Sequence, residues 1–220
     1  MQRIKPLPGK EAHLCMAAAH RREELLRDAV PEQAVDAAVL VLLSPVNAGL
    51  TREELMQWPV LLIRRSAYNG VHSGQIAFPG GKREKEDASL WAAACREARE
   101  EMGIAEAHVV PVCPLSEIYV GASNFLVHPF VAVKRAPLAY CPSPREVAGY
   151  RELPLGLFDP ARAASRPVSR SGSGGTVPSW ECDEGLVWGA TAMMLAELHT
   201  LVGEGGLVPA CSDTSTNATG

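Results

Sequence analysis

Three glutamates stand at positions that would bring their carboxylates together on a helix. Glu97, Glu100 and Glu101 follow the spacing i, i+3 and i+4, and side chains at this spacing share one helix face. Taken alone, a stripe of glutamates is more often a solvated face than a binding site. Close carboxylates repel one another, however, and a hard divalent cation relieves that repulsion more completely than solvent does. The spacing therefore indicates a cation site if the neighbouring residues support one.

The residues on either side of the glutamates favour the binding interpretation. Phe78-Pro79-Gly80-Gly81 lies upstream, and paired glycines let a backbone approach a ligand where a side chain would clash. We expect one helix between Asp87, as its N-cap, and Gly103, as its C-terminal stop. A carboxylate cluster beside a phosphate-binding loop is the arrangement expected for magnesium chemistry on phosphates.

Together these residues resemble the Nudix box, whose pattern is G-x5-E-x7-R-E-U-x-E-E-x-G-U, with U an aliphatic residue. Asp87 replaces the first glutamate of the pattern, the spacing from there to Arg96 is one residue longer, and Ala98 is small for the U position. The first acidic residue has a mostly structural role in the family, so the ligand half of the motif is intact. The matching positions are Gly81, Arg96-Glu97, Glu100-Glu101 and Gly103-Ile104.

The resemblance implies a role for each matching residue. Glu97, Glu100 and Glu101 would bind Mg²⁺ or Mn²⁺, and the Gly81 backbone would help to hold the metal. Arg96 would orient the glutamates by ion pairing. A metal-activated water would attack one phosphorus of a diphosphate, and the metal would neutralise charge on the leaving phosphate. The general base varies within the family, and three residues are candidates for it here: Glu97, Glu101 and Glu146.

A second stretch, upstream of the box, is similar to the signature of coenzyme A diphosphatases, L-L-T-x-R-[SA]-x3-R-x3-G-x3-F-P-G-G. Ile63 replaces the threonine of that signature and Gly70 replaces its second arginine. The similarity implies hydrolysis of coenzyme A or an acyl derivative to a phosphopantetheine product and adenosine 3′,5′-bisphosphate. The positions in register are Leu61-Leu62, Arg65, Ser66, Gly74 and Phe78-Pro79-Gly80-Gly81.

Because Gly70 replaces the second arginine of the signature, substrates other than coenzyme A remain alternatives. A guanidinium is the natural partner of phosphate oxygens, so its absence bears on substrate binding. Arg65 or His72 could compensate for Gly70, and we assign Arg65, His72 and Gln75 to substrate binding. For His72 and Gln75, simple loop structure explains the pattern equally well. One alternative is a Nudix enzyme for ADP-ribose or a dinucleoside polyphosphate. Another is a catalytically silent nucleotide sensor, which the intact glutamates disfavour.

Strands and helices alternate irregularly along the chain, which favours an α/β domain with a mixed sheet. The family resemblance implies a Nudix-type α/β/α sandwich. We expect one domain over residues 1–220, with a core over about 35–202 and a flexible tail over 203–220. His128 and Trp188 are expected to be core residues, with an aromatic wall for an adenine or pantetheine as the alternative for Trp188. We expect helices at 11–28 and 190–202 and strands at 38–43, 60–65, 109–120 and 125–134.

Composition narrows the function classes. The chain of 220 residues is 47% hydrophobic and 21% charged, with net charge −4 and a pI of about 5.9, which argues against a nucleic-acid binder. No run approaches the length of a membrane span, and no secretory signal opens the chain. The six scattered cysteines include no C-x-x-C pair. We therefore expect a cytoplasmic protein that acts on a small-molecule diphosphate, with a homodimer possible by analogy with the family.

Overall fold

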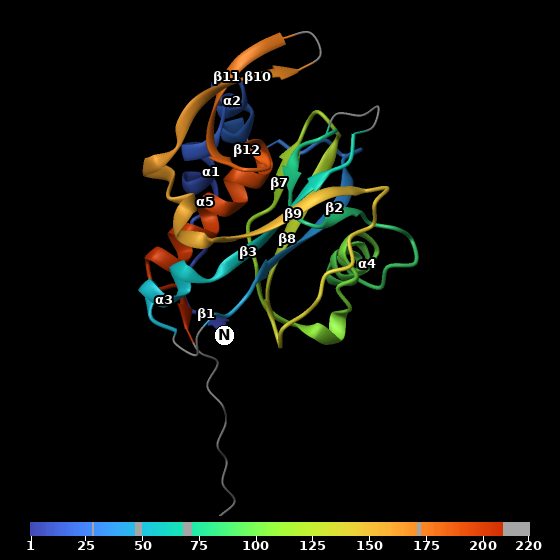
Figure 1. Cartoon of the computed structure of the whole chain (residues 1–220). Helices are drawn as coiled ribbons and strands as arrows, with labels where there is room; N and C mark the ends of the chain where they lie inside the picture. Colours follow the sequence, from blue (N-terminus) through green and yellow to red (C-terminus); the bar gives the residue numbers. More distant parts are fainter. Residues whose placement is uncertain (28, 47–49, 68–71, 171–172, 209–220) are drawn as a thin grey trace, which may run out of the picture.

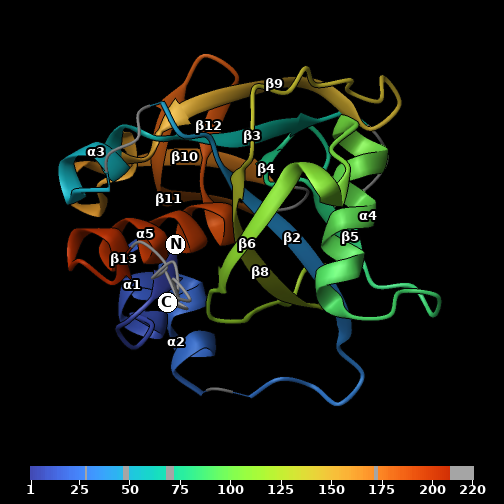
Figure 2. The same cartoon turned by 90° about the horizontal axis from the view of Figure 1, so that it is seen from below.

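The computed structural model describes residues 1–27, 29–46, 50–67, 72–170 and 173–208. Its centre is a mixed sheet in the order β4-β3-β2-β8-β6, with β5 added to β2, β7 to β8 and β9 to β3 (Figures 1 and 2). β2 and β8 run parallel, and the pairings around them are antiparallel. The strands are β2 (Val35–Leu43), β3 (Pro59–Arg65), β4 (Ile76–Ala77), β5 (Gly80–Lys82), β6 (Val109–Pro114), β7 (Ile118–Val120), β8 (Phe125–Lys134) and β9 (Val147–Pro154).

Helices cover both faces of the sheet, which confirms the expected α/β/α sandwich (Figure 2). Helix α4 (Leu90–Met102) packs against one face. On the other face lies α5 (Gly189–Gly203), with α1 (Gly9–Met16) packed against it. The sheet thus separates α4, which carries Glu97, Glu100 and Glu101, from α5. A short helix, α3 (Arg52–Gln57), leads from β2 to β3.

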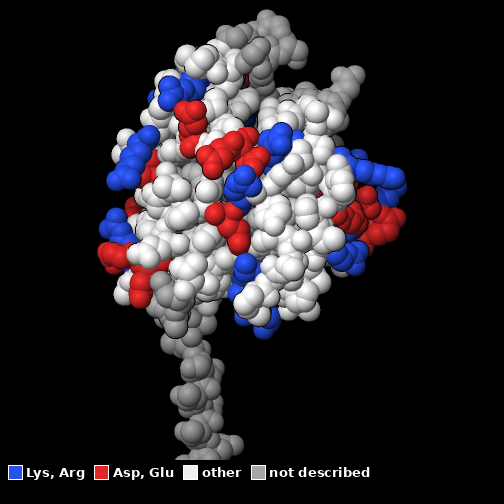
Figure 3. Space-filling model, in the orientation of Figure 1, with Lys and Arg blue, Asp and Glu red and all other residues white. Residues whose placement is uncertain are grey.

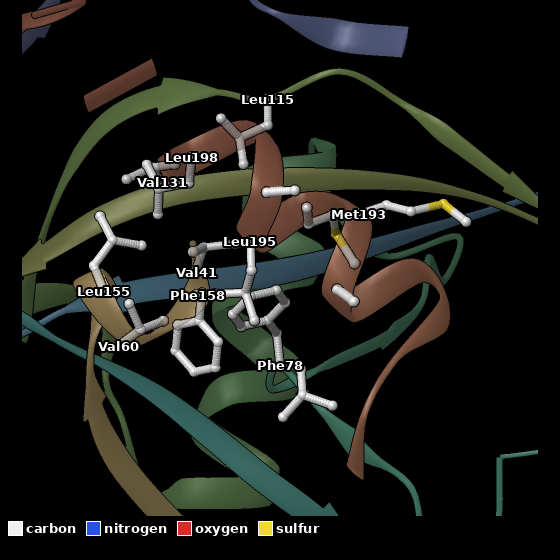
Figure 4. Packing of buried hydrophobic residues seen from close by; sticks show 14 of the residues in the cluster. Val41, Val60, Phe78, Leu115, Val131, Leu155, Phe158, Met193, Leu195 and Leu198 are labelled. Carbon is white, nitrogen blue, oxygen red and sulfur yellow. The ribbon is translucent and has the colours of Figure 1, made fainter. Parts of the chain in front are cut away.

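The apolar run in β2 is explained by burial on both of its faces. Leu40 and Leu42 pack in the cluster that includes α4, whereas Val41 and Leu43 pack in the cluster that includes α5. Successive strand side chains point to opposite faces, so a strand covered on both sides reads as continuously hydrophobic. Figure 4 shows the cluster on the α5 side, including Val41 and Leu195.

Helix α4 begins two residues later than the sequence indicated. Ser89, not Asp87, is its N-cap, and the Ser89 hydroxyl accepts a hydrogen bond from the Ala92 backbone N–H at 3.1 Å. Asp87 instead accepts from the Glu84 backbone N–H at 2.8 Å. Both residues are good caps by type, and the carboxylate at 87 is drawn away by the ion pair described below. The predicted stop is confirmed: Gly103 has φ +73°, a left-handed conformation that favours glycine.

Other boundaries also differ from expectation. The prediction of a single opening helix over 11–28 is wrong. Ala17 is extended (ψ 129°) and separates two helices, α1 and α2 (Ala19–Arg27). The expected strand over 109–120 is two strands, β6 and β7. Part of the expected tail is structured, since β13 (Leu207–Val208) pairs with β1 (Gln2–Arg3). Between β9 and α5 the chain forms three further strands, β10 (Ala164–Arg170), β11 (Ser173–Cys182) and β12 (Gly185–Val187).

The outside of the molecule carries mixed charge. Figure 3 shows basic and acidic side chains interspersed over one face, as expected from 21 basic and 25 acidic residues. Some of them pair across strands: Glu184 lies 3.1 Å from Arg64 and 2.7 Å from Arg151. Within the described residues, no helix combines the length and the hydropathy that crossing a membrane requires.

A buried hydrogen bond between His13 and Glu197 fastens α1 to α5. His13 Nε2 lies 2.8 Å from Glu197 Oε2, and Ser116 Oγ donates to Glu197 Oε1 at 2.6 Å. His13 is 1% and Glu197 is 0% exposed. Burial by itself raises the pKa of Glu197, but the bonds from His13 and Ser116 outweigh it and leave that pKa below its ordinary value. Glu197 therefore stabilises the fold above its unfolded-state pKa, and this stabilisation is lost as the pH falls through the folded-state pKa.

We predict that His13→Ala lowers the free energy of unfolding at pH 7 by about 3 kcal/mol, because it removes the His13 side chain from a buried carboxylate and leaves only the donors on the Ser116 and Gly9 side of it. Urea unfolding measures this change. The difference from the wild-type protein should shrink below pH 4.5, the ordinary pKa of Glu197, as that carboxyl becomes protonated. His108→Ala, at an exposed position, is the control. An equal loss in the control, or a difference that does not change with pH, would contradict this assignment.

Candidate active site

Strand β5 brings two glycines against β2. Gly80 pairs with Val39, and Gly81 pairs with Ala38. Gly80 has φ +153°, and a Cβ at this position would lie 2.4 Å from the Ala38 carbonyl oxygen. A side chain would therefore push β5 away from the sheet, so the glycine permits the close approach of these strands.

Gly81 faces Glu97 of α4. A Cβ at Gly81 would lie 2.6 Å from both the carboxyl carbon and Oε1 of Glu97. Because glycine has no side chain, the space between the Gly81 backbone and this carboxylate stays open. A cradle of carboxylate and backbone oxygens suits a hard divalent cation.

Glu101 is the most buried of the three glutamates, with its side chain 2% exposed. Its Oε2 accepts a hydrogen bond from the Gly80 backbone N–H at 2.9 Å, and its Oε1 lies 3.1 Å from Arg65 Nη2. Burial raises the pKa of Glu101 to about 7, although Arg65 and the Gly80 N–H act in the opposite direction. Strongly shifted acids beside a specific charge partner are typical of functional sites.

Arg96 organises the acidic side chains of α4 and the preceding loop. Its guanidinium donates to Asp87 Oδ1 at 3.0 Å, to Glu97 Oε1 at 2.9 Å and to Glu100 Oε2 at 3.3 Å. The bond from Arg96 lowers the pKa of Asp87. Burial raises the pKa of Glu97, and Arg96 offsets part of that increase. The ion pairs that the sequence predicted for Arg96 are therefore present, and Asp87 belongs to the same network.

The three glutamates do not converge on one point. Glu97 and Glu100 both contact Arg96, whereas Glu101 contacts a different arginine, Arg65. Over the part of the chain that the structure describes, no three His, Cys, Asp or Glu side chains are close enough to hold a metal ion between them. Magnesium, however, is usually held by one or two carboxylates together with waters and substrate phosphates. The donor set therefore fits a cation that substrate and solvent help to coordinate.

A cavity of about 630 Å³ opens beside the two glycines, and the residues that line it include Gly81, Arg65, His72 and Gln75, which the sequence singled out. His72 Nδ1 lies 3.2 Å from Gln75 Oε1, so these two side chains also contact each other. Gly70 lies outside the described residues. Because Arg65 also contacts Glu101, it joins the cavity to the carboxylates of α4.

Glu146 stands immediately before β9, and its side chain is exposed. Its backbone carbonyl accepts a hydrogen bond from the Ser66 N–H at 2.8 Å. The charge on Glu146 contributes to the raised pKa of Glu101, so the two carboxylates lie within electrostatic reach. Glu97, Glu101 and Glu146 therefore all stay candidates for the general base.

Two expected core residues have other surroundings. Trp188 is partly exposed and lines the cavity directly before the start of α5. In the sequence, the only indication of this position was that a tryptophan directly precedes Gly189. The ring of His128 lies 2.9 Å from Asp36 Oδ1 and 3.2 Å from Glu117 Oε1, so it contacts two carboxylates instead of packing in the apolar core. The adjacent Val127 lines the cavity, and His128 therefore points to the opposite face of the sheet.

We predict that Arg96→Lys lowers the free energy of unfolding by about 3 kcal/mol, because an ammonium cannot replace the forked bonds to partly buried carboxylates. Asp87, with its side chain 6% exposed, would lose its main partner. Urea unfolding at pH 7 measures the change, and Arg99→Lys, at an exposed position on the same helix, is the matched control. Equal stability of the two variants would exclude a structural role for the Arg96 network.

Comparison with known proteins agrees with this arrangement. The NUDIX domain family matches residues 43–171, more than half of the chain. The uncharacterized Nudix hydrolase NudL of Enterobacter sp. (strain 638) is 34% identical over 184 residues, which cover 83% of this chain and 92% of that protein. NudL of Yersinia pestis (strain Pestoides F) is 35% identical over 140 residues, which cover 63% of this chain and 70% of that protein.

The crystal structure of a Nudix hydrolase from M. smegmatis, RenU, has the same fold, with a TM-score of 0.54 at 20% identity. The similarity covers 80% of this chain and 91% of that one. Fold, box residues and relatives thus agree, and the chain belongs to the Nudix family. It is a hydrolase that acts on diphosphate bonds.

Proposed function

We propose that this Nudix hydrolase cleaves the diphosphate of coenzyme A or an acyl-coenzyme A. The products would be a phosphopantetheine and adenosine 3′,5′-bisphosphate. The observation that carries the proposal is that Arg65 and Gly81, both in the signature stretch upstream of α4, line the cavity and also adjoin Glu101 and Glu97. A diphosphate at this junction would lie between the carboxylates and a cavity large enough for the rest of the substrate.

Nudix hydrolases generally use a divalent metal ion, and in this proposal that ion is Mg²⁺ or Mn²⁺. Glu97, Glu100, Glu101 and the Gly81 backbone would hold it. When bound, it would neutralise charge on the phosphate oxygens and lower the pKa of a water molecule. Arg96 would keep Glu97 and Glu100 oriented, because it already contacts both carboxylates.

The chain's own residues would bind the diphosphate and move the proton. Arg65 lines the cavity and donates to the Gly80 carbonyl oxygen at 3.2 Å, and its remaining N–H groups would pair with phosphate oxygens. His72 and Gln75, on the same wall, would contact the substrate beside it. The proton of the attacking water would pass to one of the three candidate bases, Glu97, Glu101 or Glu146. In this proposal the enzyme is cytoplasmic and acts on a small-molecule substrate, without a nucleic-acid or membrane partner. A homodimer is the proposed oligomeric state.

A substrate panel tests the proposal. We expect kcat/KM for coenzyme A to exceed that for ADP-ribose and for a dinucleoside polyphosphate by about 100-fold, the discrimination that a few specific contacts provide. The assay is run with Mg²⁺ and with Mn²⁺, against a metal-free control. Preference for another diphosphate would retain the chemistry and reject coenzyme A. Nucleotide binding without turnover of any of the three would favour the sensor.

A further inference from the structure

The cavity beside the active site is lined by two kinds of residue. Next to Gly81, its wall carries the polar side chains of Arg65, His72 and Gln75. The rest of the wall is mainly apolar and comes from both the sheet and the helices that cover it. Its apolar part, here termed the apolar wall, is represented by Met16, Val39, Phe125, Val127, Met193 and Met194.

The apolar wall is continuous with the main hydrophobic core. Met16 is 1%, Met193 2% and Val127 7% exposed, and all three pack in the cluster that joins the sheet to α5. Methionine side chains are flexible and polarisable, so they fit irregular aliphatic groups well. A ligand group placed here would be shielded from water by side chains that are already buried.

Two polar groups on this part of the wall, on Thr191 and Arg21, are already used inside the protein. The hydroxyl of Thr191 donates to the Ile76 carbonyl oxygen at 3.1 Å. Arg21, at the rim, donates to the Tyr119 carbonyl oxygen and to Glu24, each at 2.5 Å. A base or ribose needs hydrogen-bonding partners along its edge, whereas an aliphatic chain needs none. The stretch formed by Met16, Val127, Met193 and Met194 therefore suits hydrocarbon better than a nucleoside.

Much of the apolar wall lies outside the segment that matches the Nudix family. Met16 belongs to α1, before residue 43, and Met193 and Met194 belong to α5, after residue 171. These two helices pack on each other and are fastened by the buried His13–Glu197 pair. The matched segment, residues 43–171, thus contributes one side of the cavity, and helices α1 and α5 contribute the other side.

We infer that the apolar wall is a subsite for an aliphatic acyl chain, so that the enzyme prefers an acyl-coenzyme A thioester to free coenzyme A. This inference rests on the proposed function. Each methylene that the wall buries should raise kcat/KM about fourfold, until the chain fills the space. The preference should reach a limit with chain length, because the cavity is bounded by residues of the packed core.

Ala190 offers a way to fill the subsite without touching the polar end. It lies in the first turn of α5, lines the cavity and is only partly buried. Ala190→Leu adds three carbon atoms to the wall. Ala107→Leu makes the same chemical change at an exposed position outside the cavity and is the matched control. If Ala190→Leu fails to fold, as judged by thermal unfolding, Ala190→Val applies the same change on a smaller scale.

The experiment compares free coenzyme A with acetyl-, butyryl-, hexanoyl- and octanoyl-coenzyme A, using the full chain with Mg²⁺. We expect the ratio of kcat/KM for octanoyl-coenzyme A to that for coenzyme A to fall about tenfold or more in Ala190→Leu and to stay at the wild-type value in Ala107→Leu. Turnover with equal kcat/KM for all chain lengths would overturn the inference while leaving the proposed function intact. A chain-length preference that Ala190→Leu does not reduce would also overturn it.

A binding measurement separates the inference from the chemistry. Calorimetric titration with S-octanoyl phosphopantetheine and with phosphopantetheine requires no hydrolysis. Tighter binding of the octanoyl compound to the wild-type protein, lost in Ala190→Leu, would support the subsite even if no coenzyme A derivative were hydrolysed. Equal binding of the two compounds would reject it. Failure of hydrolysis alone would count only against the proposed function.

Discussion

Glu97→Gln should lower kcat for coenzyme A hydrolysis by about 10³-fold, because it removes a carboxylate charge that would neutralise and hold the cation. The change preserves the shape of the side chain, and the amide oxygen can still accept the bond that Arg96 donates to Oε1 at 2.9 Å. The loss should therefore appear in kcat and in the concentration of Mg²⁺ needed for half-maximal activity, with little change in thermal stability. Steady-state kinetics over a range of Mg²⁺ concentrations measure both quantities.

Glu86→Gln is the control for this variant, because Glu86 is an exposed glutamate on the loop before α4. It makes the same change in net charge close to the site and should retain kcat within about twofold, as expected for a surface substitution. A loss below tenfold in Glu97→Gln would show that the reaction does not depend on this carboxylate. A similar loss in both variants would point to a general effect of charge.

The second large effect is expected from Gly81→Ala, which should lower kcat by about 100-fold. The new Cβ would lie 2.6 Å from the Glu97 carboxyl carbon, so either this carboxylate or β5 must move. A displacement of about 1 Å at a reacting site is enough for a loss of that size. The overall fold should persist, because the clash involves the end of a side chain. Kinetics together with thermal unfolding separate the two effects.

Gly203→Ala provides the matched glycine control. It lies at the end of α5, and a Cβ there would meet its nearest atom, Met56 Cε, at 3.6 Å, which is ordinary contact. We expect unchanged kcat and a free energy of unfolding within about 1 kcal/mol of the wild-type value. Full activity of Gly81→Ala would mean that the space beside Glu97 has no role in the reaction.

The sequence predicted the parts of the site that depend on local spacing. Glu97, Glu100 and Glu101 lie on α4 because a helix fixes which residues share a face, and Gly103 ends that helix because it can adopt positive φ. Likewise, a continuous apolar run was enough to predict β2, because both faces of that strand are covered.

Features that depend on distant contacts were not predictable in this way. Arg65 and Glu101 are 36 positions apart in the sequence, and their contact exists only because β5 brings Gly80 to the end of α4. The choice of Ser89 over Asp87 as N-cap depends on Arg96, which draws the carboxylate at 87 into an ion pair. The apolar wall combines residues of the first helix, the sheet and the last helix, so no one of these segments alone indicates it.

Hydrolysis of coenzyme A in water enriched in ¹⁸O tests the central claim most directly. Mass spectrometry of the products should show one ¹⁸O atom in either the phosphopantetheine or the adenosine 3′,5′-bisphosphate, and both products should require a divalent metal. This result would demonstrate attack of water on one phosphorus of the diphosphate. Release of inorganic phosphate from the 3′ position, cleavage elsewhere in the molecule, or no metal-dependent product would contradict the account.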